Sequence, residues 1–141
     1  MENAPLISII HTFARIPLLF LFVYTFVGGF KKWRYHAQTG AIAVTIDLLL
    51  SIAYMANRLL GDRFSDSQAD FTGWVLVYII IHGIIATILI VMEVLLIIER
   101  IKNARTNPWT RFHRVMSRMV FFTWCFIFVT GEFFFVYTYL L

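Results

Sequence analysis

Four histidines are the residues of this 141-residue chain best suited to chemistry, because a neutral imidazole nitrogen binds iron, copper and other transition metals. His36 and His113 each open an apolar stretch that follows a basic segment, whereas His82 and His11 lie toward the far ends of two other apolar stretches. If these stretches are helices that lie side by side, the histidines form an inner tier and an outer tier. Two tiers of two histidines suit a bundle that holds two haem groups through axial imidazoles, and they suit copper equally well.

Simpler roles are open for the same side chains. His36 and His113 fall at the level of the lipid headgroups, where a histidine costs little and need not bind anything. His82 lies within the apolar run from Val75 to Leu96, where an imidazole needs a partner. A ligand role and a hydrogen bond to another helix are both consistent with that position. His11 can also lie outside the hydrocarbon, together with the first turns of the chain, and then needs no partner in the bundle.

Charged residues in the apolar stretches repeat at helical spacing. His36, Asp47 and Arg58 are each eleven residues apart, and this spacing is close to three helical turns, so the three share one face. His82 and Glu93 have the same spacing and define a polar stripe on the next stretch. Carboxyl groups inside a membrane can relay protons or pair with a cation. The polar stripes are therefore predicted to face the interior of the bundle.

Two further ionisable residues complete this set: Arg15, one turn beyond His11, and Glu132, toward the end of the last stretch. Arg15 with Asp47, and Arg58 with Glu132, are predicted to lie at matching depths and to form static ion pairs. Arg15, or the bases around His113, could also neutralise the propionates of a haem.

The elements that position these side chains are four long apolar stretches, at residues 5–30, 37–60, 72–99 and 112–141. A hydrocarbon core about 30 Å thick needs roughly 20 helical residues to cross it, and each stretch is long enough. Strands of a membrane barrel are about half that length and alternate in polarity, so they are excluded. With 60% hydrophobic and 14% charged residues, the chain is predicted to be all-α, a single integral membrane four-helix bundle over residues 1–141.

Basic residues in the connecting loops predict the orientation of the bundle. They gather in the first and third loops: Lys31, Lys32, Arg34, Arg100, Lys102, Arg105, Arg111 and Arg114. Positively charged loops face the cytoplasm, so both termini are predicted to lie outside. The net charge of +4 then reflects topology and gives no reason to expect a nucleic-acid partner. Membrane lipid is the expected surrounding.

Motifs of independent enzymes are lacking. The sequence has no glycine-rich phosphate loop, no C-x-x-C and no H-E-x-x-H. Any chemistry is therefore expected between the helices. We expect the chain to work with a larger membrane complex rather than as an independent enzyme.

Short motifs in a fixed order resemble the family called domain of unknown function 420, from roughly residue 30 onward. These motifs are Tyr35-His36, Ile81-His82 with Ala86-Thr87, Phe112-His113-Arg114, and Trp124 with Val129-Thr130-Gly131 and Tyr137. CtaM-like members of that family are linked to the maturation of haem-copper terminal oxidases in bacteria. The resemblance implies that the family's histidines correspond to His36, His82 and His113. Many members also have a histidine near the outer end of the second span, where this chain has Arg58, so a second ligand pair would need His11.

Three functions are consistent with this sequence. The first is an assembly factor of a haem-copper oxidase in the bacterial inner membrane, which handles haem or copper through His36, His82 and His113. The second is a small b-type cytochrome subunit that carries electrons between quinol and a partner, with His36 and His113 on an inner haem b and His82 with His11 on an outer one. The third is a structural subunit of a respiratory complex, whose polar residues only hold the bundle together.

Overall fold

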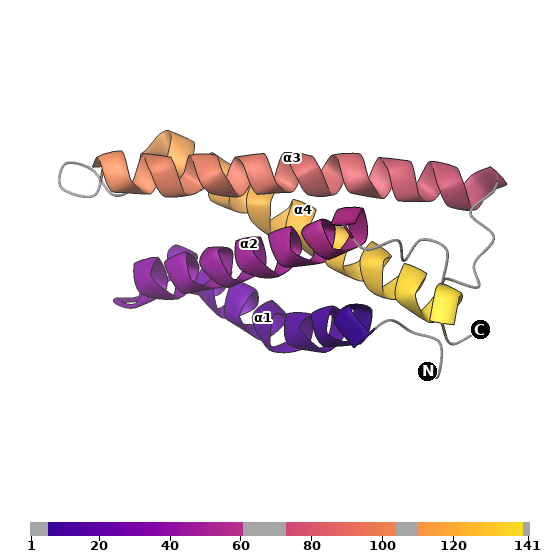
Figure 1. The fold of residues 1–141 in the computed structure, drawn as a ribbon. Coiled ribbons are helices and arrows are strands. Elements are labelled where there is room, and N and C mark those ends of the chain that lie inside the picture. The colour runs from indigo at the N-terminus through magenta and orange to yellow at the C-terminus, as the bar shows by residue number, and fades with distance from the viewer. Residues whose placement is uncertain (1–5, 61–72, 104–109, 140–141) are drawn as a thin grey trace.

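The computed structural model describes residues 6–60, 73–103 and 110–139 of the chain, and Figure 1 shows its helices. They are α1 (Leu6–Phe30), α2 (His36–Leu60), α3 (Gly73–Asn103) and α4 (Arg111–Tyr139). Each helix is long and apolar enough to cross a membrane, and nearly every residue in the described ranges is helical. The prediction of an all-α, multi-pass membrane protein is confirmed.

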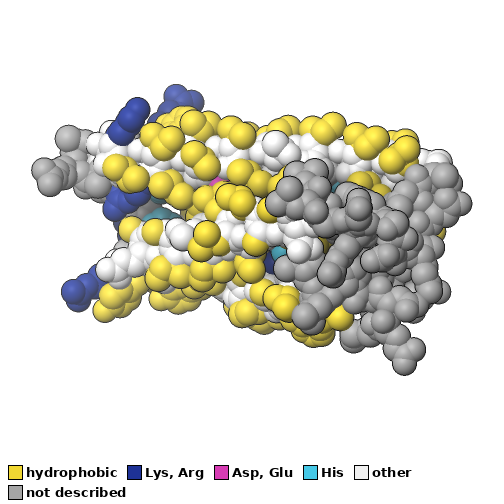
Figure 2. All heavy atoms as spheres, in the orientation of Figure 1, with side chains coloured by type: hydrophobic (Ala, Val, Ile, Leu, Met, Phe, Trp, Pro, Cys, Tyr) yellow, Lys and Arg dark blue, Asp and Glu magenta, His cyan; other side chains and the backbone are white. Residues whose placement is uncertain are grey.

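Successive helices are antiparallel, so α1 ends where α2 begins and α3 ends where α4 begins (Figure 1). α1 packs mainly against α2 and α3 against α4, α1 also contacts α4, and α2 touches α3 least. α2 and α4 are therefore diagonal neighbours across the bundle axis. We call the end at which α2 and α4 begin the basic end, because Lys and Arg side chains gather there (Figure 2).

Apolar side chains make up most of the buried core. The buried core draws on every helix and includes Leu18, Phe22, Ala43, Leu89 and Trp124. The rings of Phe22 and Trp124 stack with their centroids 4.5 Å apart. Large apolar side chains also cover the outside of all the helices, as a surface that faces lipid requires.

A tight turn between α1 and α2 sets the start of α2. Lys32 has a positive φ of 53°, and the Trp33 amide donates to the Gly28 carbonyl at 2.9 Å. This is the Schellman arrangement, which commonly ends a helix. A Cβ on Gly28 would lie 3.0 Å from the Trp33 ring, so this glycine lets the ring fold back onto α1. His36, the first residue of α2, is thereby brought over the last turns of α1.

α3 continues to Asn103, whereas the sequence prediction ended this helix at residue 99. The additional turn begins at Glu99, whose carboxyl group accepts a hydrogen bond from the Asn103 amide at 3.1 Å. Arg100 and Lys102 lie in this last turn, where the helix dipole favours positive charge. Arg100 and Lys102 therefore belong to a helix end and not to the predicted loop. This turn takes part in the site described next.

Candidate functional site

The two histidines that open α2 and α4 meet inside the basic end of the bundle. The ring centroids of His36 and His113 are 6.3 Å apart, and the ring planes are nearly perpendicular, at 87°. The two rings come from α2 and α4, which are diagonal neighbours in the bundle. The structure thus brings the predicted inner tier together.

A backbone carbonyl of α1 fixes the His36 ring. Its Nδ1 atom lies 2.8 Å from the carbonyl oxygen of Thr25. A carbonyl oxygen only accepts hydrogen bonds, so Nδ1 carries the proton and Nε2 carries the lone pair that a metal would bind. The ring also rests on Gly29, where an added Cβ would lie 2.9 Å from His36 Cε1. A glycine in α1 therefore makes room for the imidazole.

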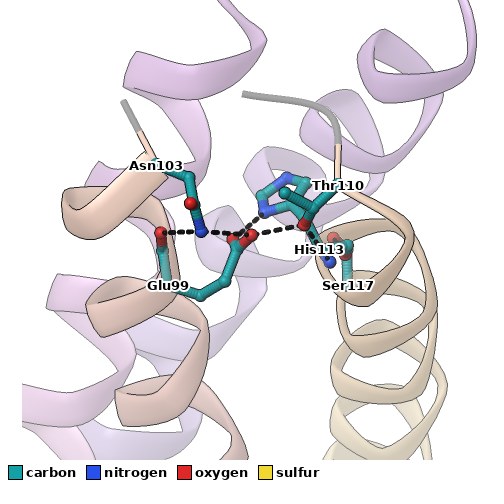
Figure 3. Close-up of polar contacts among 5 residues, drawn as sticks. All are labelled: Glu99, Asn103, Thr110, His113 and Ser117. Atoms are coloured by element: carbon teal, nitrogen blue, oxygen red, sulfur yellow. Dashed lines mark hydrogen bonds and ion pairs between the residues drawn. The ribbon is translucent and has the colours of Figure 1, made fainter. Parts of the chain in front are cut away.

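A carboxylate of α3 fixes the His113 ring (Figure 3). His113 Nδ1 lies 3.2 Å from Glu99 Oε2. The other carboxylate oxygen of Glu99 accepts hydrogen bonds from the Thr110 hydroxyl and the Asn103 amide. Thr110 also caps α4, since its hydroxyl accepts from the His113 backbone amide at 3.0 Å. Carboxylates that accept from Nδ1 in this way commonly orient metal-binding histidines.

Basic side chains lie at the same end of the bundle as this histidine pair (Figure 2). Arg100 lies within electrostatic range of His113, and the Arg118 guanidinium lies over the Phe30 ring, 5.2 Å from its centroid. Further Lys and Arg side chains cover the same end of the bundle (Figure 2). An anionic group such as a haem propionate can therefore be neutralised beside the two imidazoles.

The outer tier is arranged differently. His82 Nδ1 lies 3.0 Å from Thr130 Oγ1, and this hydroxyl donates its own proton to the Phe126 carbonyl at 2.7 Å. His82 therefore donates through Nδ1, as the inner histidines do. The His11 ring stacks on Tyr54 with centroids 4.4 Å apart, and its buried Nε2 has no hydrogen-bond partner within the described part of the chain. His11 and His82 lie within electrostatic range of each other, but each ring is held by a different neighbour.

Charged and polar side chains meet between the two tiers. Arg15 Nη2 lies 3.9 Å from Asp47 Oδ1 and donates to the Ser51 hydroxyl at 3.2 Å. The Trp124 indole donates to the same Asp47 oxygen at 2.8 Å. Glu93 is completely buried beside them. The predicted ion pair between Arg15 and Asp47 is confirmed, and the residues beside the inner histidines are the bases of the basic end rather than Arg15.

The second predicted ion pair lies partly outside the described residues, because the Arg58 side chain is among those that the structure does not describe. Its predicted partner, Glu132, is half-buried in α4. Glu132 lies beside Thr12 of α1 and within electrostatic range of Arg15. This carboxyl group therefore faces α1, and its predicted pairing with Arg58 stays a prediction.

Sequence reasoning missed two groups that hold the inner histidines. Glu99 is an acid in a segment dominated by bases, fourteen residues before His113, and that isolated charge is a signal that could have found it. Thr25 acts through its backbone carbonyl, which no side-chain pattern reveals. The bond from Trp124 to Asp47 depends on how the helices pack and likewise has no local signal.

No family model, curated protein or solved structure matches this chain. Among the residues that the structure describes, no group of three or more His, Cys, Asp or Glu side chains is placed to hold a metal ion. The candidate site is thus a pair of imidazoles whose Nδ1 protons are engaged by protein acceptors. Such a pair suits a metal whose remaining ligands do not come from the protein.

Proposed function

We propose that this chain binds haem, or a copper ion, between His36 and His113 and works as an assembly factor for a haem-copper terminal oxidase. The separation of the two rings supports this proposal. Two imidazoles that bind one metal atom through bonds of about 2 Å have centroids roughly 6 Å apart. The centroids of His36 and His113 are 6.3 Å apart.

The donor set favours haem over copper. An iron porphyrin would need two ligands from the protein, and His36 and His113 would supply them. When bound, haem supplies the redox chemistry of its iron. The residues of this chain would orient the two imidazoles and neutralise anionic groups of the haem. Thr25 and Glu99 hold the two rings through Nδ1, and Arg100 contributes positive charge near His113. Copper fits the same nitrogens, with its further ligands supplied by a partner.

Charge supports an orientation of the bundle in the membrane. Lys and Arg side chains gather at the basic end (Figure 2), and the positive-inside rule assigns such an end to the cytoplasm. We propose a bacterial inner membrane, as the family resemblance implies, with both termini outside and the histidine pair near the cytoplasmic surface. A haem or metal ion arriving from the cytoplasm would meet this site first.

A second candidate function is a small b-type cytochrome subunit that passes electrons between quinol and a partner. One observation favours it: His82, near the opposite end, donates through Nδ1 to Thr130 in the same manner as the inner pair. A second haem at that level would give a path across the membrane. His11, which is stacked on Tyr54, would have to turn toward His82 to complete that site.

Deletion of the gene and complementation with variants tests the proposed function. An assembly factor predicts that the deleted strain still contains the oxidase polypeptides but lacks oxidase activity and its haem or copper. The wild-type chain should restore activity, whereas His36→Ala and His113→Ala should not, at equal membrane levels. Full activity with both variants would contradict the proposal. Stoichiometric haem in the chain as purified, before any haem is added, would instead favour the cytochrome subunit.

A further inference from the structure

Two carboxyl groups lie side by side in the interior of the bundle, far from the inner histidines. Asp47 of α2 is 1% exposed and Glu93 of α3 is 0% exposed. Each carboxyl group lies within electrostatic range of the other and of the Arg15 guanidinium. Asp47 is the twelfth residue of the 25 in α2, so the pair sits near the middle of the span.

Polar atoms in this pair lack partners. Asp47 Oδ1 accepts from the Trp124 indole at 2.8 Å. Asp47 Oδ2 and both carboxyl oxygens of Glu93 are buried and have no hydrogen-bond partner among the described residues. Burying a carboxyl group without hydrogen-bond partners is energetically unfavourable, and buried polar groups in native proteins are rarely left unpaired. We therefore expect this site to bind a further group that interacts with these oxygens.

The charges of the cluster indicate that the further group is a cation. Two carboxylates carry two negative charges, and Arg15 supplies one positive charge. Trp124 of α4, which donates to Asp47, is neutral. Glu132, His82 and His11 lie within electrostatic range of Arg15. One further positive charge would make the cluster neutral.

The number of ligands decides between a proton and a metal cation. Hard metal cations take about six or more oxygen ligands, and the described residues offer no group of three or more acidic or histidine side chains arranged for a metal. A proton needs only two oxygens: one carboxyl oxygen binds it, and an oxygen of the neighbouring carboxylate accepts the resulting O–H hydrogen bond.

We propose that Asp47 and Glu93 bind one proton between them and form a proton-binding site in the middle of the membrane. The site exchanges with the end opposite the basic end, because Ser51, Glu132 and Thr12 continue the polar side chains in that direction. Toward the basic end, buried apolar side chains fill the bundle instead: Phe22, Ala43, Val44 and Val120.

Infrared spectroscopy of the full-length protein in lipid vesicles tests this proposal. A protonated carboxyl group has a C=O stretch that is separate from the ionised carboxylate and amide bands, and the stretch shifts to lower frequency in D₂O. At neutral pH the wild-type protein should show such a band, and both Glu93→Gln and Asp47→Asn should abolish it. The matched control Glu132→Gln, which changes another intramembrane carboxyl group, should keep it.

The wild-type spectrum decides the question even if a variant fails to fold, since the absence of a protonated-carboxyl band would overturn the proposal. Selective carbon-13 labelling of glutamate or aspartate assigns the band without any substitution. A band that survives both Glu93→Gln and Asp47→Asn, or that disappears when sodium is added to the wild type, would also overturn it. A band that shifts in D₂O and is lost only with this pair would support it.

Discussion

Gly29 makes room for the His36 ring without being a ligand. Its substitution therefore displaces the His36 ring but leaves the imidazole itself unchanged. An alanine Cβ at residue 29 would lie 2.9 Å from His36 Cε1 and 3.3 Å from Nδ1. Non-bonded carbon atoms prefer separations of about 3.5 to 4.0 Å, so the ring must retreat by roughly 0.6 to 1.1 Å. That movement strains the 2.8 Å hydrogen bond to the Thr25 carbonyl, which orients the ring.

Loss of an orienting partner commonly lowers metal affinity by about 10- to 100-fold, which corresponds to about 1.4 to 2.7 kcal/mol. We expect Gly29→Ala to weaken the binding of added haem by that factor, as measured by optical titration of the detergent-purified protein. Gly83→Ala is the matched control, because an added Cβ there meets nothing within 4 Å, and alanine is the better helix former. Equal haem affinity in the two variants would refute the assigned role of His36.

Three other predictions concern side chains that hold the site and the bundle. Glu99→Gln should lower haem affinity about tenfold or more by weakening the orientation of His113, and an unchanged optical titration would contradict this. Arg15→Leu should destabilise the bundle by about 3 to 5 kcal/mol, because it leaves a buried carboxylate without its counter-ion, and denaturant unfolding in detergent measures this loss. Adding Asp47→Leu to that variant should recover most of the stability; a further loss of the same size would show that the two residues are not coupled. Trp124→Phe keeps the stacked ring but removes the donor to Asp47, so it should cost about 1.5 to 3 kcal/mol in the same assay, and a neutral result would mean that this bond contributes nothing.

The fold could be predicted because the physics of the membrane leaves few choices. A span of the hydrocarbon needs roughly 20 helical residues, and the chain offers four such runs. The inner tier could also be predicted, since His36 and His113 both follow basic segments at the same membrane surface. The Arg15–Asp47 ion pair followed from depth alone. Each of these predictions needed only the depth of a residue along the membrane normal.

The other features depend on rotation and packing, which a single sequence encodes weakly. The depth of His11 matches that of His82, but the His11 ring stacks on Tyr54 because of how α1 and α2 pack. The sequence predicts that the third span ends at Glu99. In the structure α3 continues past it, and the Glu99 carboxylate binds His113. Contact between Asp47 and Glu93 also requires two particular helix faces to meet, a choice that the eleven-residue spacing left open.

The most direct test of the inner site is a reduced-minus-oxidised optical spectrum of the detergent-purified protein, with iron and copper quantified in the same sample. The measurement is made after exposure to haem and copper, on the wild type and on His36→Ala, His113→Ala and His11→Ala. We predict that the wild type and His11→Ala hold about one haem or one copper ion per chain at this site and that the two inner variants lose it. Equal haem and copper contents in the wild type, His36→Ala and His113→Ala would contradict the assignment of a metal to this pair.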